Sequence, residues 1–544
     1  MRLRLRRLLD WRALLVYAHR WLGIVGCVLF AAWFVSGIVM MYARMPSLAP
    51  EEKLARAADL DLSTVTLSPS DAAKRAGVSA GDVSDVQIAM LRGRPIYRFG
   101  AGGRNNRRSA TGPPAVFADT GEAWRDTGVD DARAAARVFE PDYTGTLHDD
   151  GFLTEPDQWT LQARAALPMY RFALDDAAAT RLYVSAATGE VVLRTTRKER
   201  VWGYLGPVIH WIYFTPLRRN GPLWTEVIIW SSLAGCLMCA TGLVWGAIRF
   251  SPFARFRLKR VPARSPYAGW MKWHHYAGLL FGVVTLTWVY SGLLSMGPFN
   301  WFRPVGGRNQ TRPSRHEPPE ALTVQQLRDA HAAFTSSFPP KTMKTMKMTR
   351  IDGQTYWMTE RAPSVAEADR WRGPSLLPRT FRPRLARAYV AAVHPERAVF
   401  DRFPVETLNA AAHEAMGDTP VAESVWLHAY DGFYYDARGA DPLPVLRIRY
   451  ADPQETWLYL DPTTGGIVQR SEKVTRLRRW LYQGLHSLDF PFLYYRRPLW
   501  DIVVIILSIG GAALSVTTMA PAWRRLARHA RRWFRHVLVP APGP

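Results

Sequence analysis

Four long apolar stretches separate the polar parts of the chain. Each stretch is 21 or 22 residues long and contains no charged residue: 21–42, 227–248, 276–296 and 502–522. A helix of this length crosses a bilayer core of about 30 Å, so the pattern predicts four transmembrane helices. The two long polar segments, about residues 43–200 and 299–478, alternate strand-like runs with short polar helices. We therefore expect each of them to fold as an α+β domain.

Local signals inside the polar segments predict hairpins and helix starts. The strand-like runs 182–184 and 458–460 each lead into a turn rich in Thr and Gly and then into another apolar run, as in a β-hairpin. Residues 100–114, rich in Gly, Arg and Asn, are expected to form an exposed loop. Two pairs have the spacing of a helix capping box: Ser68 with Asp71, and Thr323 with Gln326.

The positive charge of the chain is concentrated beside the apolar stretches. Of the net charge of +24, residues 1–12, 249–272 and 521–544 carry +4, +7 and +6. These three segments lie on the same side of an even number of helices. The positive-inside rule then places both termini in the cytoplasm and the two α+β segments on the outer side of the membrane. Because topology accounts for the charge, we expect no nucleic-acid partner.

The two halves of the chain match at nearly fixed offsets. The surroundings of His19 correspond to those of His274 at an offset of 255, and the surroundings of His210 correspond to those of His486 at an offset of 276. Both halves begin in the cytoplasm, so the repeats are parallel, related by an axis along the membrane normal. Equivalent residues are therefore expected to face one another at equal depth.

Histidines are the main candidates for chemistry in the membrane. His19 and His274 lie at the cytoplasmic ends of the first and third helices, whereas His210 and His486 precede the second and fourth helices at the outer face. Neutral imidazole is an axial ligand of haem iron, so the two pairs predict two haem b groups, each held by two histidines. The haem would be non-covalent, because no C-x-x-C-H motif is present. His275 could replace His274, since the sequence does not determine the rotation of the helix.

Other polar and aromatic residues in the membrane carry weaker signals. Trp33 and Trp288 fall at mid-depth, where they either line a route between the haems or fill the bundle, and we expect packing. Glu226 and Asp501 lie at the outer interface and are expected to be solvated, with a proton or cation role as the alternative.

These residues are also the ones in which the chain resembles the PepSY-associated transmembrane proteins. That family includes haem-containing inner-membrane reductases linked to ferric siderophore uptake. The resemblance covers nearly the whole chain and implies periplasmic PepSY domains on a four-helix core, with haem b bound through His19, His274, His210 and His486. It rests on four stretches: HRWLG at 19–23, WHHYAGL at 273–279, LHSLDF at 485–490 and RPLWD at 497–501.

The predicted organisation alternates membrane helices with polar segments. Each half of the chain consists of a helix, a PepSY-like domain, an interfacial segment and a second helix. In the first half these are 13–42, 43–200, 201–222 and 223–248, in that order. In the second half they are 273–298, 299–478, 479–498 and 499–522. Three basic cytoplasmic segments flank the helices: 1–12, 249–272 and 523–544.

The expected function is electron transfer across the inner membrane to a periplasmic ferric chelate, with iron in a siderophore as the acceptor. The cytoplasmic segments are too short to fold a flavin or nicotinamide domain, so the electron donor is quinol or a separate cytoplasmic reductase. Two other classes stay open. One is a non-catalytic PepSY regulator that binds a peptide or protease, and the other is a transporter, which the lack of charged residues at mid-membrane disfavours. Beyond the lipid bilayer, the sequence specifies neither the donor nor the oligomeric state.

Overall fold

The structure is a computed structural model of the 544-residue chain. It describes residues 11–78, 83–101, 114–258, 260–301, 322–338, 343–364, 385–435 and 441–538. The chain divides into two compact units. The helical unit comprises Met1–Met45, Val201–Arg303 and Leu477–Pro544, and the sheet unit comprises Pro46–Arg200 and Pro304–Arg476.

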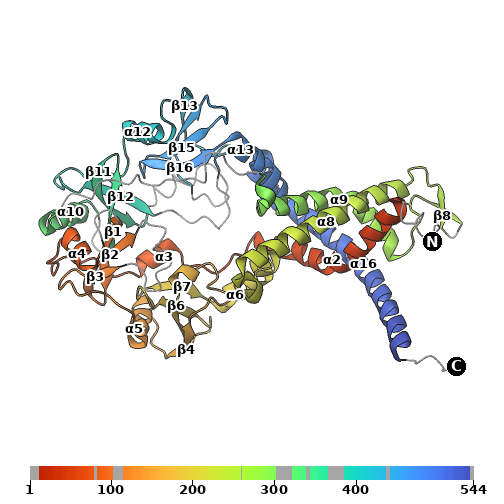
Figure 1. The fold of residues 1–544 in the computed structure, drawn as a ribbon, viewed down its shortest axis with the longest axis horizontal. Coiled ribbons are helices and arrows are strands. Elements are labelled where there is room, and N and C mark those ends of the chain that lie inside the picture. Colours follow the sequence, from red (N-terminus) through yellow and green to blue (C-terminus); the bar gives the residue numbers. More distant parts are fainter. Residues whose placement is uncertain are drawn as a thin grey trace. The chain divides into compact units, whose positions relative to one another are not determined.

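Four long helices dominate the helical unit (Figure 1): α2 (Trp11–Met40), α8 (Gly221–Arg249), α9 (Trp270–Ser295) and α16 (Leu499–Leu538). All four are long and apolar enough to cross a membrane, which confirms the four predicted spans. Helix α2 packs against α8 and α16, and α9 packs against the same two helices, so the four form a closed bundle. Two helices extend well beyond their apolar cores. Helix α2 begins at Trp11, and α16, which is 40 residues long, continues to Leu538 in the segment predicted as a basic tail.

Short helices lead into α8 and α16 in similar ways. Before α8 come α6 (Arg197–Gly203), the π-helix η3 (Tyr204–Val208) and α7 (Thr215–Arg219). Before α16 come α13 (Lys473–Arg479), the π-helix η5 (Trp480–Gly484), α14 (Leu485–Ser487) and α15 (Pro491–Tyr494). Single π-helical turns are rare and occur frequently at functional sites. The β8–β9 hairpin (Phe256–Leu258, Val261–Ala263) joins α8 to α9, and the short η4 (Pro298–Asn300) follows α9.

The sheet unit contains one six-stranded sheet built from both polar segments. Its strand order is β12-β11-β10-β1-β2-β3, and every neighbouring pair is antiparallel. Three strands come from each segment: β1 (Val83–Leu91), β2 (Arg94–Ala101), β3 (Ala115–Phe117), β10 (Thr345–Ile351), β11 (Gln354–Arg361) and β12 (Ala386–Ala391). Strands β1 and β10 join the segments, with Val86 opposite Met348. The segments expected as two separate domains therefore share a sheet.

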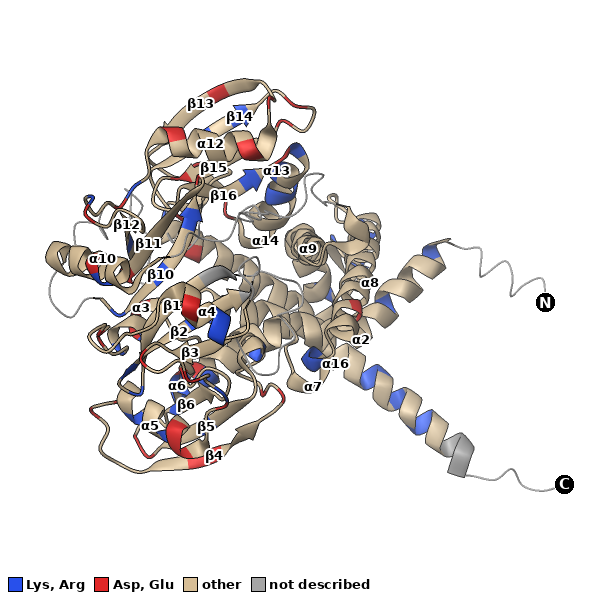
Figure 2. Ribbon diagram, turned by 60° about the vertical axis from the view of Figure 1, so that its left-hand side comes forward, with Lys and Arg blue, Asp and Glu red and all other residues tan. Residues whose placement is uncertain are grey.

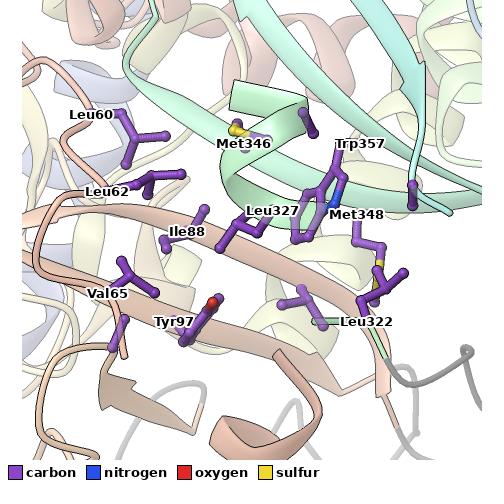
Figure 3. Close-up of a cluster of buried hydrophobic side chains, with 14 of the residues drawn as sticks. Leu60, Leu62, Val65, Ile88, Tyr97, Leu322, Leu327, Met346, Met348 and Trp357 are labelled. Atoms are coloured by element: carbon purple, nitrogen blue, oxygen red, sulfur yellow. The ribbon is translucent and has the colours of Figure 1, made fainter. Parts of the chain in front are cut away.

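The two segments also share a hydrophobic core against this sheet (Figure 3). Val65 and Ile88 from the first segment pack in one cluster with Leu327, Met346 and Trp357 from the second, and all five side chains are inaccessible to solvent. Helices α4 (Pro69–Arg75) and α10 (Val324–Ser337) contribute residues to the cluster. Since buried apolar area stabilises a fold by about 25 cal/mol per Å², this core favours joint folding of the segments.

Each segment also forms a four-stranded antiparallel sheet with a helix packed against it. The first sheet contains β4 (Leu147–Leu153), β5 (Met169–Leu174), β6 (Arg181–Ser185) and β7 (Val191–Thr195), with α5 (Val129–Phe139). The second contains β13 (Val421–Leu427), β14 (Val445–Tyr450), β15 (Trp457–Asp461) and β16 (Gly466–Ser471), with α12 (Val405–Met416). Two short helices complete the unit: α3 (Pro50–Ala55) and η2 (Arg164–Ala166).

Several local predictions can be compared directly with these elements. Both predicted hairpins are present, as β6–β7 and β15–β16. Thr323 and Gln326 form a complete capping box at the start of α10, and Ser68 caps α4 by accepting a hydrogen bond from the backbone N–H of Asp71. Most of the loop expected at 100–114 lies outside the described residues.

Candidate functional site

His19 and His274 face each other inside the helical bundle. Their ring centres are 6.1 Å apart, with His19 on α2 and His274 on α9. The Nδ1 of His19 lies 2.9 Å from the carbonyl oxygen of Met238 on α8, and that of His274 lies 3.2 Å from the carbonyl oxygen of Leu514 on α16. A carbonyl can only accept, so each Nδ1 must carry the proton. The lone pair of each neutral ring is then on Nε2, the form that binds a metal.

His210 and His486 make a second pair with the same arrangement. Their ring centres are also 6.1 Å apart. Each Nδ1 lies 3.2 Å from a backbone carbonyl oxygen, that of Trp33 for His210 and that of Trp288 for His486. A serine follows each of these tryptophans three residues later, and its Oγ is within hydrogen-bond distance of the same Nδ1. Ser36 Oγ lies 3.2 Å from His210, and Ser291 Oγ lies 3.1 Å from His486. Hence four histidines have the same tautomer for the same reason.

Glycines make room for the rings. A Cβ atom added at Gly242 would lie 2.4 Å from Cε1 of His19, which a real Cβ does not tolerate. At Gly37 and Gly292 a Cβ would be 3.5 Å from His210 and 3.6 Å from His486, an ordinary contact. Gly242 is therefore required for the position of His19, whereas Gly37 and Gly292 are not under the same constraint. No periodicity in the sequence indicated Gly242.

The spacing of both pairs fits two ligands on one metal ion. An imidazole nitrogen binds a transition metal at about 2 Å, and the ring centre lies about 1 Å behind the nitrogen. Two imidazoles on opposite sides of one ion therefore have ring centres about 6 Å apart. Among the described residues, no group of three or more His, Cys, Asp or Glu could hold a bare metal ion. A pair of histidines alone suits an ion whose other ligands come from a macrocycle, as in haem.

His275 is held in a different way from His274. Its side chain is buried, with Nε2 2.8 Å from the carbonyl oxygen of Gly246 and Nδ1 2.8 Å from Oγ of Ser265. The carbonyl fixes the proton on Nε2, so Nδ1 accepts from the Ser265 hydroxyl. Both ring nitrogens of His275 are therefore engaged within the protein. These bonds tie α9 to α8 and to the loop that connects them.

Aromatic side chains lie between the two pairs. The rings of Phe30 and Trp33 are 5.4 Å apart, and those of Phe34 and Trp288 are 5.8 Å apart. All four belong to one apolar cluster at the centre of the bundle. Trp33 and Trp288 pack there, as expected, and their carbonyls also orient the second pair. The Nε1 of Trp288 is buried and has no hydrogen-bond partner among the described residues.

The two turns that carry His210 and His486 differ chemically. Behind His486, Arg479 and Asp489 form a buried ion pair with Nη1 and Oδ1 2.8 Å apart. The turn behind His210 instead packs Tyr213 against Trp224 in an edge-to-face contact, with ring centres 5.2 Å apart. The sequence signalled this difference through the residues that follow each histidine, but the pairing of Arg479 emerges only in the structure.

The two carboxylates at the ends of the helices also differ. Glu226 is exposed and accepts a hydrogen bond from the indole N–H of Trp230 at 3.0 Å. Asp501 is largely buried, pairs with Arg497 and accepts from the hydroxyl of Tyr42 at 3.2 Å. The expectation that both are solvated is therefore wrong for Asp501, because the adjacent Arg497 covers and neutralises it.

Comparison with known proteins identifies one family. The family model described as the PepSY-associated TM region matches residues 16–372, about two thirds of the chain. The match includes His19, His210 and His274 but ends before His486. No curated protein matches the chain.

Proposed function

We propose that this chain, which belongs to the family of the PepSY-associated TM region, is a dihaem b oxidoreductase of the inner membrane. It passes electrons across that membrane to a periplasmic acceptor, Fe(III) held by a siderophore, and so serves iron acquisition. The observation that carries the proposal is the equal spacing of the pairs His19–His274 and His210–His486, whose ring centres are 6.1 Å apart in both cases.

The protein's own contribution is to orient and shield the four imidazoles. Each Nδ1 is bound to a backbone carbonyl, which sets the tautomer and limits rotation of the ring. Such outer-shell hydrogen bonds also raise the basicity of a ligating histidine. Haem b, when bound, supplies a one-electron carrier whose potential depends on its axial ligands and burial. We assign the first site to His274 rather than His275, because both nitrogens of His275 bond within the protein.

The spacing of the pairs supports a path across the bilayer. His19 and Trp33, whose carbonyl holds His210, are 14 residues apart on α2. This corresponds to about 21 Å along a helix, a large part of the thickness of the bilayer core. The cluster of Phe30, Phe34 and Trp288 occupies the space between the two levels.

The proposed topology has both termini in the cytoplasm and the sheet unit in the periplasm. Arginine residues follow one another along the end of α16 (Figure 2), and in the sequence basic residues are also frequent up to the start of α2 and in the loop between α8 and α9. Segments next to membrane helices carry an excess of Lys and Arg on the cytoplasmic side, so this distribution supports the proposed topology. We also propose that the halves are parallel repeats, since the carbonyl partners Met238 and Leu514 differ by the same offset of 276 as His210 and His486. The donor is quinol or a separate cytoplasmic reductase.

The decisive experiment measures haem in protein purified in detergent from haem-replete cells. A pyridine haemochrome assay and a dithionite difference spectrum should give two haems b per chain. His19→Ala and His486→Ala should each lose one haem, because each removes one ligand of a different pair. His148→Ala is the matched control, since His148 is exposed on β4, and it should retain both. With haem established, reduction of a ferric siderophore can be assayed in vesicles.

A haem-free but folded parent protein would exclude the oxidoreductase. It would favour the alternative function, a non-catalytic PepSY regulator whose sheet unit binds a peptide or protease.

A further inference from the structure

The end of α16 combines strong positive charge with exposed apolar side chains. The helix has 40 residues, which corresponds to about 60 Å, twice the length needed to cross a bilayer core. Its final part carries six arginines and no acidic residue: Arg524, Arg525, Arg528, Arg531, Arg532 and Arg535. Exposed aromatic residues are interspersed with them or adjoin them, with Trp523 72% and Trp533 61% exposed. This composition suits the boundary between lipid headgroups and acyl chains.

Arg525 lies close to other positive charges in this region. Arg525 on α16 experiences the positive charges of Arg20 on α2 and Arg528 on its own helix. Within the part of the chain that the structure describes, Arg525 Nε is buried and has no hydrogen-bond partner. Nearby, the rings of Trp21 and His529 lie 5.8 Å apart and hold the two helices together. Like charges gathered at a helix contact destabilise it unless an anion lies between them.

We propose that Arg20, Arg525 and Arg528 bind the phosphate of an anionic phospholipid in the leaflet next to the two ends of the chain. Guanidinium groups bind phosphate oxygens through two parallel hydrogen bonds, and the unpaired Nε of Arg525 is such a donor. The ligand is a lipid rather than a free phosphate because the arginines border apolar surface: Tyr17 on α2 and Trp523 on α16 are both exposed. Aromatic residues of this kind sit at the headgroup level of a bilayer.

Native mass spectrometry of the full chain in detergent, titrated with phosphatidylglycerol, tests this site. The double variant Arg525→Gln/Arg528→Gln should bind the tightest lipid roughly 30-fold more weakly, since each arginine near an anionic surface contributes about 1 kcal/mol. The matched control is Arg524→Gln/Arg531→Gln. It removes the same charge from the same helix on a face about 80° away, and should lose much less affinity.

Three results would overturn the proposal. Equal losses in the two double variants would mean that binding depends on net charge alone. Equal affinity of the parent for phosphatidylcholine would remove the role of lipid charge. Displacement of the bound lipid by an equal concentration of inorganic phosphate would indicate a free-anion site. Circular dichroism and size-exclusion profiles of all variants establish that they are folded. The outcome does not depend on haem, so it is independent of the proposed function.

Discussion

The rings of His210 and His486 face each other with their centres 6.1 Å apart, and each is held by the carbonyl of a tryptophan on a neighbouring helix. A backbone carbonyl cannot be replaced by substitution of its own residue. The orientation of each ring therefore depends on how the helices pack, and changes in packing are the most direct way to test the site.

Gly242→Ala should remove the haem at His19 and leave the other haem in place. The added methyl group would lie 2.4 Å from Cε1 of His19, so the ring must leave its position opposite His274. We expect haem content to fall from two to one per chain in the haemochrome assay. The control is Gly246→Ala, one turn further along α8, where the new Cβ would be 3.6 Å from its nearest neighbour. Equal loss of haem in both variants would contradict a specific contact with His19.

His275→Ala and His274→Ala should have opposite effects. Removing His275 leaves Ser265 and the Gly246 carbonyl without their partner, at a cost of about 1–3 kcal/mol per unsatisfied buried group. We expect His275→Ala to lower the midpoint of thermal unfolding but to retain both haems in the folded fraction. His274→Ala should lose one haem with a smaller change in protein stability when haem-free forms are compared. Loss of a haem in His275→Ala with full retention in His274→Ala would reverse the assignment.

Glu190 should stabilise the sheet unit in a pH-dependent way. Burial alone would raise the pKa of Glu190, but the charges of Arg98 and Lys53 outweigh it and lower the pKa to about 2. Lys53 Nζ lies 2.6 Å from the carboxylate, and Arg98 also pairs with it. Because the pKa in the folded state is below the unfolded value of about 4.5, this stabilisation is present above pH 4.5 and is lost as the pH falls towards 2.

Glu190→Gln tests this ion pair. At pH 7 we expect the free energy of unfolding to fall by about 2 kcal/mol, allowing for solvent around Lys53, and the difference from the parent to shrink between pH 4.5 and pH 3. Thermal unfolding of both proteins in detergent at several pH values measures this difference in stability. Glu122→Gln is the control, because Glu122 is mostly exposed and pairs with Arg94 only at 3.5 Å. A difference between Glu190→Gln and the parent that stays constant down to pH 3 would argue against the pKa shift.

The shared six-stranded sheet should make the two polar segments unfold together. Trp357→Ala, in the second segment, creates a cavity in the common core and should cost about 3–5 kcal/mol. Hydrogen exchange measured by mass spectrometry should then increase in β1 and β2 of the first segment as well as in β10–β12. Val138→Ala, at an exposed position of α5, is the control and should leave both regions unchanged. Faster exchange confined to β10–β12 would mean that the segments are independently stable.

The sequence alone determined the elements that depend on local pattern. Charge-free stretches of membrane length predicted the four spans, and turn residues predicted the hairpins β6–β7 and β15–β16. The pair Thr323 and Gln326 predicted the start of α10. Membrane spans, turns and caps are set by residues close together in the chain, so one sequence suffices to recognise them.

Only the tertiary structure decided which groups meet. Adjacent positions on a helix differ by about 100°, so packing alone turned His274 towards His19 and His275 towards Gly246. The pairing of β1 with β10 joins strands more than 250 residues apart, and alternation of apolar residues does not specify a strand's partner. The carbonyls that hold the four rings leave no trace in the sequence, because every residue has a carbonyl and only the approach of the helices selects which ones bond.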